Sequence, residues 1–521
     1  MATSFAGIKT KLDKPSWQAT PLIYNALHVI QTATAGSTLV GDKRPSQYKL
    51  DKTFFLNSAT TLFQFSTKGN GWMQLQSPAL AGTFGIGAIQ VYCPSLGPRG
   101  TIAAGATTTT VTLSTVLPVT VAFNQLKGYR LRIVNNIAGG GQTGEATIVS
   151  NTAGTTPLIT VSSSFGFTPA TGATYEFLTG RLYMMNAGTV AAGIWKYYDV
   201  CTNSMSGNLA TTNLPATVGT GSAIVALDEQ HTPITGVNSV AINGETGGYF
   251  GNLTATAISG TTLTGQAASG DAAVLANEYR NFQIRIITDS TNPTAVGQRR
   301  RITSHTAGAS PVYTVPAWTV TPSATCTYVI ENNNDILFWT AATTTTYAYN
   351  PITDAWSTAL YAVKPAANAA GTCAFHPFGT VLNAGKTIRH SYIYNFRGGV
   401  TNSLDILDIA AATTGTWTSD SVYDNRGLVT FGSSSGCAYN AVDNVALVVP
   451  ITLLNVQTNM YYFDLERMSL MPYAPCPQIS STVVDGDRTV VDFYVDGTDK
   501  KAIFGFIPPT QSYMLTSLFF K

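Results

Sequence analysis

Charged residues are scarce in this sequence of 521 residues: Asp, Glu, Lys and Arg together make up 11% of it, against roughly 25% in typical soluble domains. The formal net charge of +2 gives no general attraction to nucleic acid. A surface this poor in charge is covered with Thr, Ser, Asn and Gln, and few charges need desolvation when a neighbour covers it. We therefore expect tight packing against neighbouring copies; the alternative is an extracellular all-β protein with a Thr-rich exterior.

Other absences narrow the class of protein. No run approaches the ~18 apolar residues that a membrane helix requires, and the amino-terminal sequence has no basic-then-apolar signal. The six cysteines lie far apart and form neither a metal-type doublet nor a dense disulfide framework. We expect a chain made in a cytosol, without a membrane-spanning segment and with free, mostly buried thiols.

Helical periodicity is scarce too, and short β-branched and aromatic runs broken by Gly, Pro, Asn or Asp take its place. Residues 129–134 and 445–449 are examples. This pattern is typical of strands and turns, so we expect a nearly all-β chain.

One short pattern recurs along the chain: a bulky residue, a turn-forming run, and a second bulky residue, usually seven positions later. The pairs are Phe65 and Trp72, Tyr198 and Met205, Tyr349 and Trp356, Leu407 and Trp417, Phe463 and Leu470, and Phe506 and Tyr513. The last four are spaced roughly as propeller blades of 40–50 residues with variable loops would be. The earlier intervals are far longer, which predicts an insertion in each.

The two insertions resemble each other. Arg132-Ile133, Gly141-Gln142 and Ile148–Gly154 recur in order as Arg285-Ile286, Gly297-Gln298 and Ile302–Gly308, and Thr168-Pro169 with Tyr175 recurs as Thr321-Pro322 with Tyr328. Chance does not produce such an ordered series. We expect two copies of one small β module.

The hairpin at residues 349–356 resembles the second half of a kelch repeat, and residues 65–72 are similar to it. The resemblance implies a kelch-like β-propeller of about six blades, in which each four-stranded blade packs on the next. The expected boundaries are 1–99 for an N-terminal segment with the first blade, 100–180 for the first inserted module, 181–257 for a further blade, 258–332 for the second inserted module and 333–521 for the remaining blades.

The inserted module resembles one that recurs in virion proteins of tailed bacteriophages. Its marks are the Arg-Ile strand, the Gly-Gln turn, the Ile-x-Ser-Asn/His-Thr-Ala segment and the Thr-Pro ending before a Tyr. Propellers with inserted β modules are similar to the tail nozzle or tail-hub proteins of short-tailed phages. That resemblance implies a homo-oligomer, a hexameric ring beneath the portal and adaptor rings, with fibres as further partners and DNA passing through the channel without sequence preference.

The cationic triplet Arg299, Arg300 and Arg301 is the one candidate contact site that the charges offer. On a strand, Arg299 and Arg301 share one face. They could bind DNA phosphate or an acidic neighbouring subunit. The favoured interpretation is a solvated turn and strand edge, where charge discourages unwanted pairing.

No constellation of residues points to catalysis, a cofactor or a metal. The glycine-rich run 139–144 lacks the helix that a dinucleotide site requires, and Cys373 with His376 supplies two of the four ligands that zinc takes. The Asp and Gly residues at 485–497 read as hairpin turns. Residues 413–417 resemble the turn motif of sialidase propellers but lack its aspartate. We expect no catalytic residues and no enzyme.

The leading hypothesis is thus a structural virion protein located in a phage tail and synthesised in the host cytoplasm, as a nozzle or tube through which DNA is delivered. The alternative is a fibre or receptor-binding protein that contacts host glycan. The third is a glycan-acting enzyme, since active-site residues of propellers come from scattered loops.

Overall fold

The structure is a computed structural model. The described residues are 24–27, 38–41, 53–58, 61–66, 71–75, 85, 87–227, 250–266, 273–331, 333–377, 391–424, 427–432, 435–440, 445–450, 459–465, 467–475, 490–496, 499–505 and 512–517. The prediction of an all-β chain is confirmed: the described residues form strands and two short 3-10 helices.

Six four-stranded antiparallel sheets make up the body of the protein. We number them 1 to 6 along the chain. Sheet 1 holds β2 (Thr38–Gly41), β3 (Thr53–Ser58), β4 (Thr61–Ser66) and β5 (Gly71–Gln74). Sheet 2 holds β6 (Ile89–Cys93), β13 (Arg181–Met185), β15 (Trp195–Asp199) and β16 (Ser204–Met205). Sheet 3 holds β18 (Ala223–Ala226), β26 (Ile336–Trp339), β27 (Tyr347–Asn350) and β28 (Ala355–Ser357).

The other three body sheets come from the C-terminal part of the chain. Sheet 4 holds β29 (Cys373–Phe375), β30 (Tyr392–Phe396), β31 (Ser403–Asp408) and β32 (Thr416–Ser421). Sheet 5 holds β35 (Gly436–Asn440), β36 (Val445–Val449), β37 (Asn459–Asp464) and β38 (Ser469–Pro475). Sheet 6 holds β39 (Val490–Asp496), β40 (Asp499–Gly505), β41 (Ser512–Ser517) and, beside β41, β1 (Tyr24–Leu27). Two short pairs complete the strands, β14 (Gly188–Thr189) with β17 (Thr217–Val218) and β33 (Tyr423–Asp424) with β34 (Gly427–Leu428).

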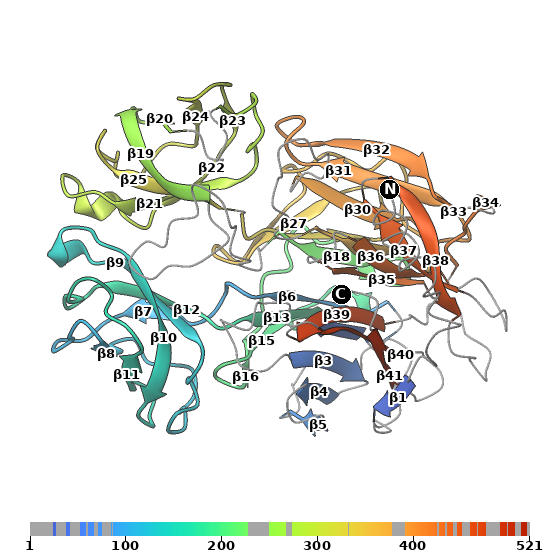
Figure 1. The fold of residues 1–521 in the computed structure, drawn as a ribbon, viewed down its shortest axis with the longest axis horizontal. Coiled ribbons are helices and arrows are strands. Elements are labelled where there is room, and N and C mark those ends of the chain that lie inside the picture. The colour runs from blue at the N-terminus through green and yellow to red at the C-terminus, as the bar shows by residue number, and fades with distance from the viewer. Residues whose placement is uncertain are drawn as a thin grey trace, which may run out of the picture.

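The first strands of the six sheets contact one another in a closed order. β2 contacts β6, β6 contacts β18, β18 contacts β29, β29 contacts β35, β35 contacts β39, and β39 contacts β2. Sheet 6 unites the two ends of the described chain, because β1 pairs with β41 (Figure 1). Each sheet therefore packs between two others and no sheet begins or ends the series.

The hairpins predicted from the bulky pairs lie between the third and fourth strands of sheets 1 to 5, and between the second and third strands of sheet 6. The directly opposed pairs are Phe65 with Trp72, Tyr198 with Met205, Tyr349 with Trp356, Leu407 with Trp417, and Phe463 with Leu470. In sheet 6 the residue opposite Tyr513 is Phe504, and Phe506 lies outside the described residues.

Where their side chains are described, the bulky residues of these hairpins belong to the core. Tyr349 and Trp356 are buried and lie 5.0 Å apart between ring centroids. Trp195 of the neighbouring sheet 2 packs on both, at 5.3 and 5.4 Å. Such tilted and edge-on contacts between large rings stabilise the packing of one sheet on the next.

Two further sheets are inserted between the first and second strands of sheets 2 and 3. Module A (residues 99–178) holds β7 (Arg99–Thr101), β8 (Thr110–Thr112), β9 (Arg130–Asn135), η1 (Ile137–Gly139), β10 (Gly144–Asn151), β11 (Leu158–Val161) and β12 (Thr174–Leu178). Module B (residues 250–331) holds β19 (Phe250–Ile258), β20 (Thr262–Gly265), β21 (Gln283–Thr288), η2 (Pro293–Ala295), β22 (Arg299–Arg301), β23 (Ser304–His305), β24 (Val312–Thr314) and β25 (Thr327–Glu331). Both lie on the same side of the body (Figure 1).

The modules share one strand order. Module A runs β7-β12-β9-β10-β11-β8, and module B runs β19-β25-β21-β22, then β23-β24-β20 and back to β19. In module A the sheet closes on itself, since the backbone N–H of Ala103 donates to the carbonyl oxygen of Thr112 at 2.9 Å. β22 and β23 of module B together occupy the place of β10, whose own register shifts between Ile148 and Ser150.

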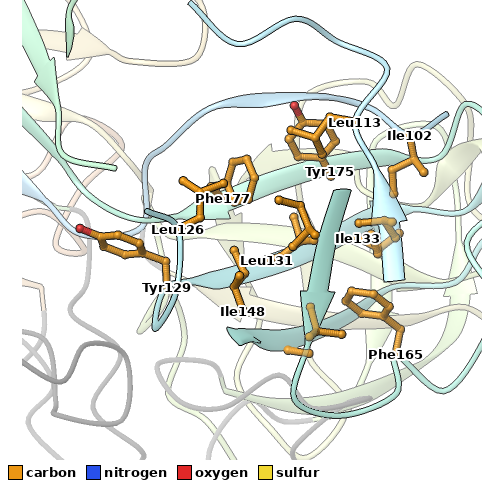
Figure 2. Close-up of a cluster of buried hydrophobic side chains, with 14 of the residues drawn as sticks. Ile102, Leu113, Leu126, Tyr129, Leu131, Ile133, Ile148, Phe165, Tyr175 and Phe177 are labelled. Atoms are coloured by element: carbon orange, nitrogen blue, oxygen red, sulfur yellow. The ribbon is translucent and has the colours of Figure 1, made fainter. Parts of the chain in front are cut away.

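Strand alternation gives each module one apolar face and one polar face. In β9 the side chains of Leu131 and Ile133 enter a core that also holds Tyr175 and Phe177 of β12 (Figure 2). Residues at the intervening positions, Arg130, Arg132 and Glu176, are turned to the opposite face. Module B repeats the pattern, with Ile284 and Ile286 in its core and Arg285 between them.

The strands differ from several predicted boundaries. Module B begins with β19 at Phe250 rather than at residue 258. The segments 1–99 and 181–257 each contain the first strand of the next sheet, β6 and β18. Segment 333–521 lacks the outer strand of sheet 6, because β1 supplies it. A break in composition marks where a loop leaves the body, and it does not tell which sheet the adjoining strand enters.

Candidate functional site

The arginine triplet Arg299–Arg301 forms β22, which pairs with β21 at the polar face of module B. We take as the candidate site the junction where this face meets module A and sheet 3. The predicted contact with DNA or with a neighbouring subunit stays a prediction. The structure shows that all three guanidinium groups are engaged inside the chain, each with a different set of partners.

Arg299 joins the two modules. Its Nη2 donates to Oε1 of Glu176 in module A at 2.8 Å, and its Nε donates to Oε1 of Glu331 in module B at 3.0 Å. Glu176 and Glu331 are both buried. A guanidinium shared by two buried carboxylates in different sheets fixes the modules to each other through charge-assisted hydrogen bonds.

Further arginines surround the two carboxylates. Arg132 donates to Glu176 at 2.7 Å, the Nη2 of Arg99 lies 3.3 Å from Glu176 Oε2, and Arg285 donates to Glu331 at 3.2 Å. A second carboxylate of module A, Glu145, pairs with Arg132 at 3.0 Å and also with Arg130. We call this set the ion cluster; it comprises Arg99, Arg130, Arg132, Glu145, Glu176, Arg285, Arg299 and Glu331.

The ion cluster keeps the carboxylates of Glu176 and Glu331 ionised. Burial alone would raise the pKa of the Glu176 carboxyl, but the guanidiniums of Arg299 and Arg99 outweigh it and hold the pKa well below its usual range. Burial would likewise raise the pKa of the Glu331 carboxyl. The guanidiniums of Arg285 and Arg299 outweigh burial, and the pKa is lowered. Because both acids are charged at neutral pH, the cluster is a structural ion network with no free general acid.

Glycines let the two modules approach closely next to the ion cluster. A Cβ on Gly141 of module A would lie 2.7 Å from the Cα of Pro293, and a Cβ on Gly297 of module B would lie 2.8 Å from a methyl of Val134. Both glycines have positive φ, +70° and +83°. The Gly-Gln turn found in both inserts is therefore where each module packs against the other.

Arg301 ties module B to the segment that leads into sheet 3. Its Nη1 donates to Asp335 at 3.0 Å, its Nε donates to Asn281 at 2.8 Å, and its guanidinium lies 4.7 Å from the ring centroid of Tyr361. The Tyr361 hydroxyl donates to the same carboxylate oxygen at 2.9 Å. Asn281 in turn donates to the carbonyl of Thr413 in sheet 4, so module B is bonded to the body at two places.

Arg300 faces the other way and bonds within module B. It donates to the carbonyl oxygens of Ala317 and Arg299 and to the side chains of Gln298 and Thr319, at 2.8–3.1 Å. Four of its five N–H groups serve this network. It acts as a brace for the loop before β25.

A cavity of about 390 Å³ opens at this junction. Its walls come from β21 and β22, from the connector between β25 and β26, and from the turn between β27 and β28. The lining residues are Gln283, Gly297, Arg299, Arg300, Arg301, Asn333, Asn334, Asp335, Asn350, Ile352 and Thr353. Asp335 is the one carboxylate among them, whereas glycoside hydrolysis by the usual mechanism takes a pair of carboxylates.

Sequence reasoning found the triplet but missed its partners. Glu176 is 123 positions from Arg299, so no local spacing connects them. One signal was available: in a chain with 11% charged residues, Arg and Glu recur at the same faces of apolar strands, at Arg130, Arg132 and Glu176. Such alternation is ordinarily typical of a solvated face, and only the scarcity of charge elsewhere in the chain sets these residues apart.

The described residues meet the requirements of neither a metal site nor a membrane-spanning helix. No group of three or more His, Cys, Asp and Glu there could hold a metal ion. Within the same ranges no helix has the length and apolar character to cross a bilayer.

Comparison with known proteins adds a structural likeness. No protein-family model matches the chain, and no curated protein does. A solved structure, Phage phi92 endosialidase, is similar with a TM-score of 0.26 and 9% sequence identity over 92% of this chain. The chain spans 58% of the length of that structure. A likeness of this size leaves function to be argued from the chain's own residues.

One prediction is corrected by this comparison. The sequence led us to expect no enzyme, and the similar structure carries the name of a glycan-degrading enzyme, an endosialidase. We therefore withdraw the statement that the protein lacks activity. Catalytic residues on scattered loops leave no linear motif, so the absence of a motif does not exclude an active site.

Proposed function

We propose that the protein is a virion component of a tailed phage, built as a closed six-bladed, kelch-like propeller that carries two copies of one β module. The closed contact order of β2, β6, β18, β29, β35 and β39 supports the propeller. The pairing of β1 with β41 supports closure of the ring, since strands from both ends of the chain complete one sheet.

The observation that carries a structural role is the rigid attachment of the modules. Arg299 bonds module B to module A, and Asn281 bonds module B to sheet 4. Modules held in this way extend the body as fixed wedges, unlike binding heads on flexible linkers. A wedge of fixed shape suits a tail nozzle, where copies form a ring around a channel through which DNA is delivered, in contact with adaptor, portal and fibre proteins.

Module A also offers a surface for a neighbouring copy. Three exposed apolar side chains, Val116, Phe123 and Leu158, come from segments bonded to the turn between β10 and β11. In module B, Leu275 is the one large apolar side chain exposed among the described residues. Grouped apolar side chains on a charge-poor surface are typical of interfaces.

The test is the oligomeric state of the purified protein. We expect a six-fold ring with an open axis by negative-stain microscopy and mass photometry. Phe123→Ser should shift the dissociation concentration upward by about ten-fold or more, because ~1.5–3 kcal/mol of apolar burial is lost. Leu275→Ser is the matched control and should leave assembly unchanged. A monomer, or a trimer without an axial opening, would refute the nozzle.

The second candidate is a fibre or receptor-binding protein that contacts host glycan. The cavity at the module junction favours it, because its walls hold amide, hydroxyl and apolar groups. A trimer or a peripheral position on the virion would support this candidate over the nozzle.

A further inference from the structure

The cavity at the junction of module B and sheet 3 has the size and position of a small-molecule site. Its volume of about 390 Å³ lies in the lower part of the range of roughly 300–1,000 Å³ for such sites. Four separate segments meet there, and sites commonly occur between structural units. One or two sugar rings are ligands of a suitable size.

The charged side chains of the cavity are already engaged. Arg299 pairs with Glu176 and Glu331, and Arg301 pairs with Asp335. Arg300 donates to four acceptors of module B. One guanidinium nitrogen, Nη2 of Arg301, is buried without a hydrogen-bond partner in the described part of the chain. The other charged groups form the bonds that hold the modules together. An ionised ligand would compete with those bonds, so the walls are suited to an uncharged ligand.

The remaining polar groups are amides and a hydroxyl. Asn350 accepts the backbone N–H groups of Ile352 and Thr353 through Oδ1, at 2.9 and 3.2 Å, which leaves its Nδ2 hydrogens for a ligand. The side chains of Asn334 and Thr353 have no hydrogen-bond partner in the described part of the chain. Amides and hydroxyls offer donors and acceptors together, and that matches sugar hydroxyls, each of which both donates and accepts.

Ile352 adds an apolar wall. Its side chain is 48% exposed at the tip of the turn between β27 and β28, beside Asn350 and Thr353. The C–H face of a pyranose ring could cover it while the ring hydroxyls reach the amides. We infer that this cavity binds an uncharged sugar residue of a glycan. The choice of ligand rests on the second candidate function and is independent of ring assembly.

Saturation-transfer difference NMR on the full chain tests the inference. The probes are the methyl glycosides of glucose, galactose, mannose and N-acetylglucosamine, with glucuronic acid as the charged partner of glucose. We expect saturation of at least one neutral glycoside and weaker saturation of the acid. No transfer to any neutral glycoside, or transfer to the acid alone, overturns the inference.

Two variants locate the binding. Asn334→Ala and Thr353→Val should each weaken the glycoside by roughly five-fold, the loss expected for one neutral hydrogen bond. Thr418→Val, at an exposed position of β32, is the matched control and should bind like the parent. Thr353 is exposed on a turn, so its variant should keep the melting temperature of the parent. Unchanged affinity in both variants would place binding elsewhere and overturn the inference. Mass photometry on the same samples measures ring assembly separately.

Discussion

Module A and module B use different side chains to accept a hydrogen bond from the equivalent backbone N–H group. In module A the backbone N–H of Leu126 donates to Oδ1 of Asn151 at 2.8 Å. At the equivalent place in module B the N–H of Tyr279 donates to Nε2 of His305 at 2.9 Å. Both acceptors are buried, so each satisfies a donor that would otherwise destabilise the fold.

The surroundings of the two acceptors match closely. Asn124 and Asn277 precede them in equivalent turns, both with positive φ, 60° and 61°. Each of these asparagines donates its N–H to the carbonyl of its acceptor residue, Asn151 or His305. The modules thus differ in the chemistry of one acceptor: an amide does not titrate near neutral pH, and an imidazole does.

The modules also contribute unequally to the contact between them. Module A supplies two of the three carboxylates of the ion cluster, and module B supplies the guanidinium that spans both sheets. The comparison predicts that the largest loss of unfolding free energy follows from replacing Glu176, the acid of module A that both modules share. Replacing groups that serve one module should cost less.

The first test is Glu176→Gln. The change leaves the guanidiniums of Arg99, Arg132 and Arg299 without their common anion, and removing one partner of a buried ion pair costs about 3–5 kcal/mol. We expect a large loss of unfolding free energy in urea, with faster hydrogen exchange in both β9 and β21. The exposed Asp420→Asn is the control. Damage confined to module A would break the comparison, because it would mean that Arg299 does not couple the modules.

The second test uses the reciprocal glycines. Gly141→Ala places a Cβ against the backbone of Pro293, and Gly297→Ala places one against a side-chain methyl of Val134. Both also carry the cost of a left-handed conformation, about 1–2 kcal/mol. We expect about 2–4 kcal/mol for Gly141→Ala and about 1–2 kcal/mol for Gly297→Ala, read from urea unfolding.

Gly105→Ala separates the two contributions. Gly105 has φ +86° and nothing within 4 Å of its added Cβ, so this variant reports the conformational cost alone. Equal losses for Gly141→Ala and Gly105→Ala would show that the modules do not press together at the Gly-Gln turn.

The hairpins could be predicted from sequence because their chemistry is local. Tyr349 and Trp356 lie opposite each other across a turn that uses Asn350 as an acceptor, and both facts are visible within eight residues. In sheet 6 the local pattern does not fix the pairing, since the residue opposite Tyr513 is Phe504.

The site was harder to predict because its bonds are distant in sequence. The order of matching segments indicates two related inserts, but nothing in it says that their polar faces meet. Arg299 and Glu176 come together only after each module has folded its apolar face inward. The sequence shows that Arg299 is charged. Only the fold determines whether its guanidinium contacts water, DNA or a buried carboxylate.

The third test is acidification, which should affect module B alone. Burial lowers the pKa of His305, and Arg280 nearby acts in the same direction. His305 therefore takes up a proton at a higher pH in the unfolded chain than in the folded one. The stability that it contributes is fully present above about pH 6.5 and is lost as the pH falls through the lower pKa of the folded state. A protonated Nε2 no longer accepts from Tyr279, so we expect a loss of about 1–3 kcal/mol.

Hydrogen exchange at the Tyr279 and Leu126 amides reads the two modules separately. After correction for intrinsic rates, protection of Tyr279 should fall between pH 7.5 and pH 5, and protection of Leu126 should not. His305→Asn should remove this pH dependence at little cost at neutral pH, about 1 kcal/mol or less, because module A uses that residue in the same place. Equal pH dependence in His305→Asn and the parent would contradict the assignment.

The reverse exchange is the most specific test, and the change in pH dependence that it should produce is the smallest effect. Asn151→His offers Leu126 the acceptor that module B uses, but it removes the bonds from Asn151 Nδ2 to the carbonyls of Ala122 and Thr152, at 2.9 and 2.8 Å. The variant should therefore be less stable at every pH, and the informative quantity is the slope. If Leu126 protection becomes acid-sensitive in the variant, a single acceptor accounts for the difference between the modules; an unchanged slope would assign that difference to other residues around His305, such as the ring of Tyr313 at 5.2 Å.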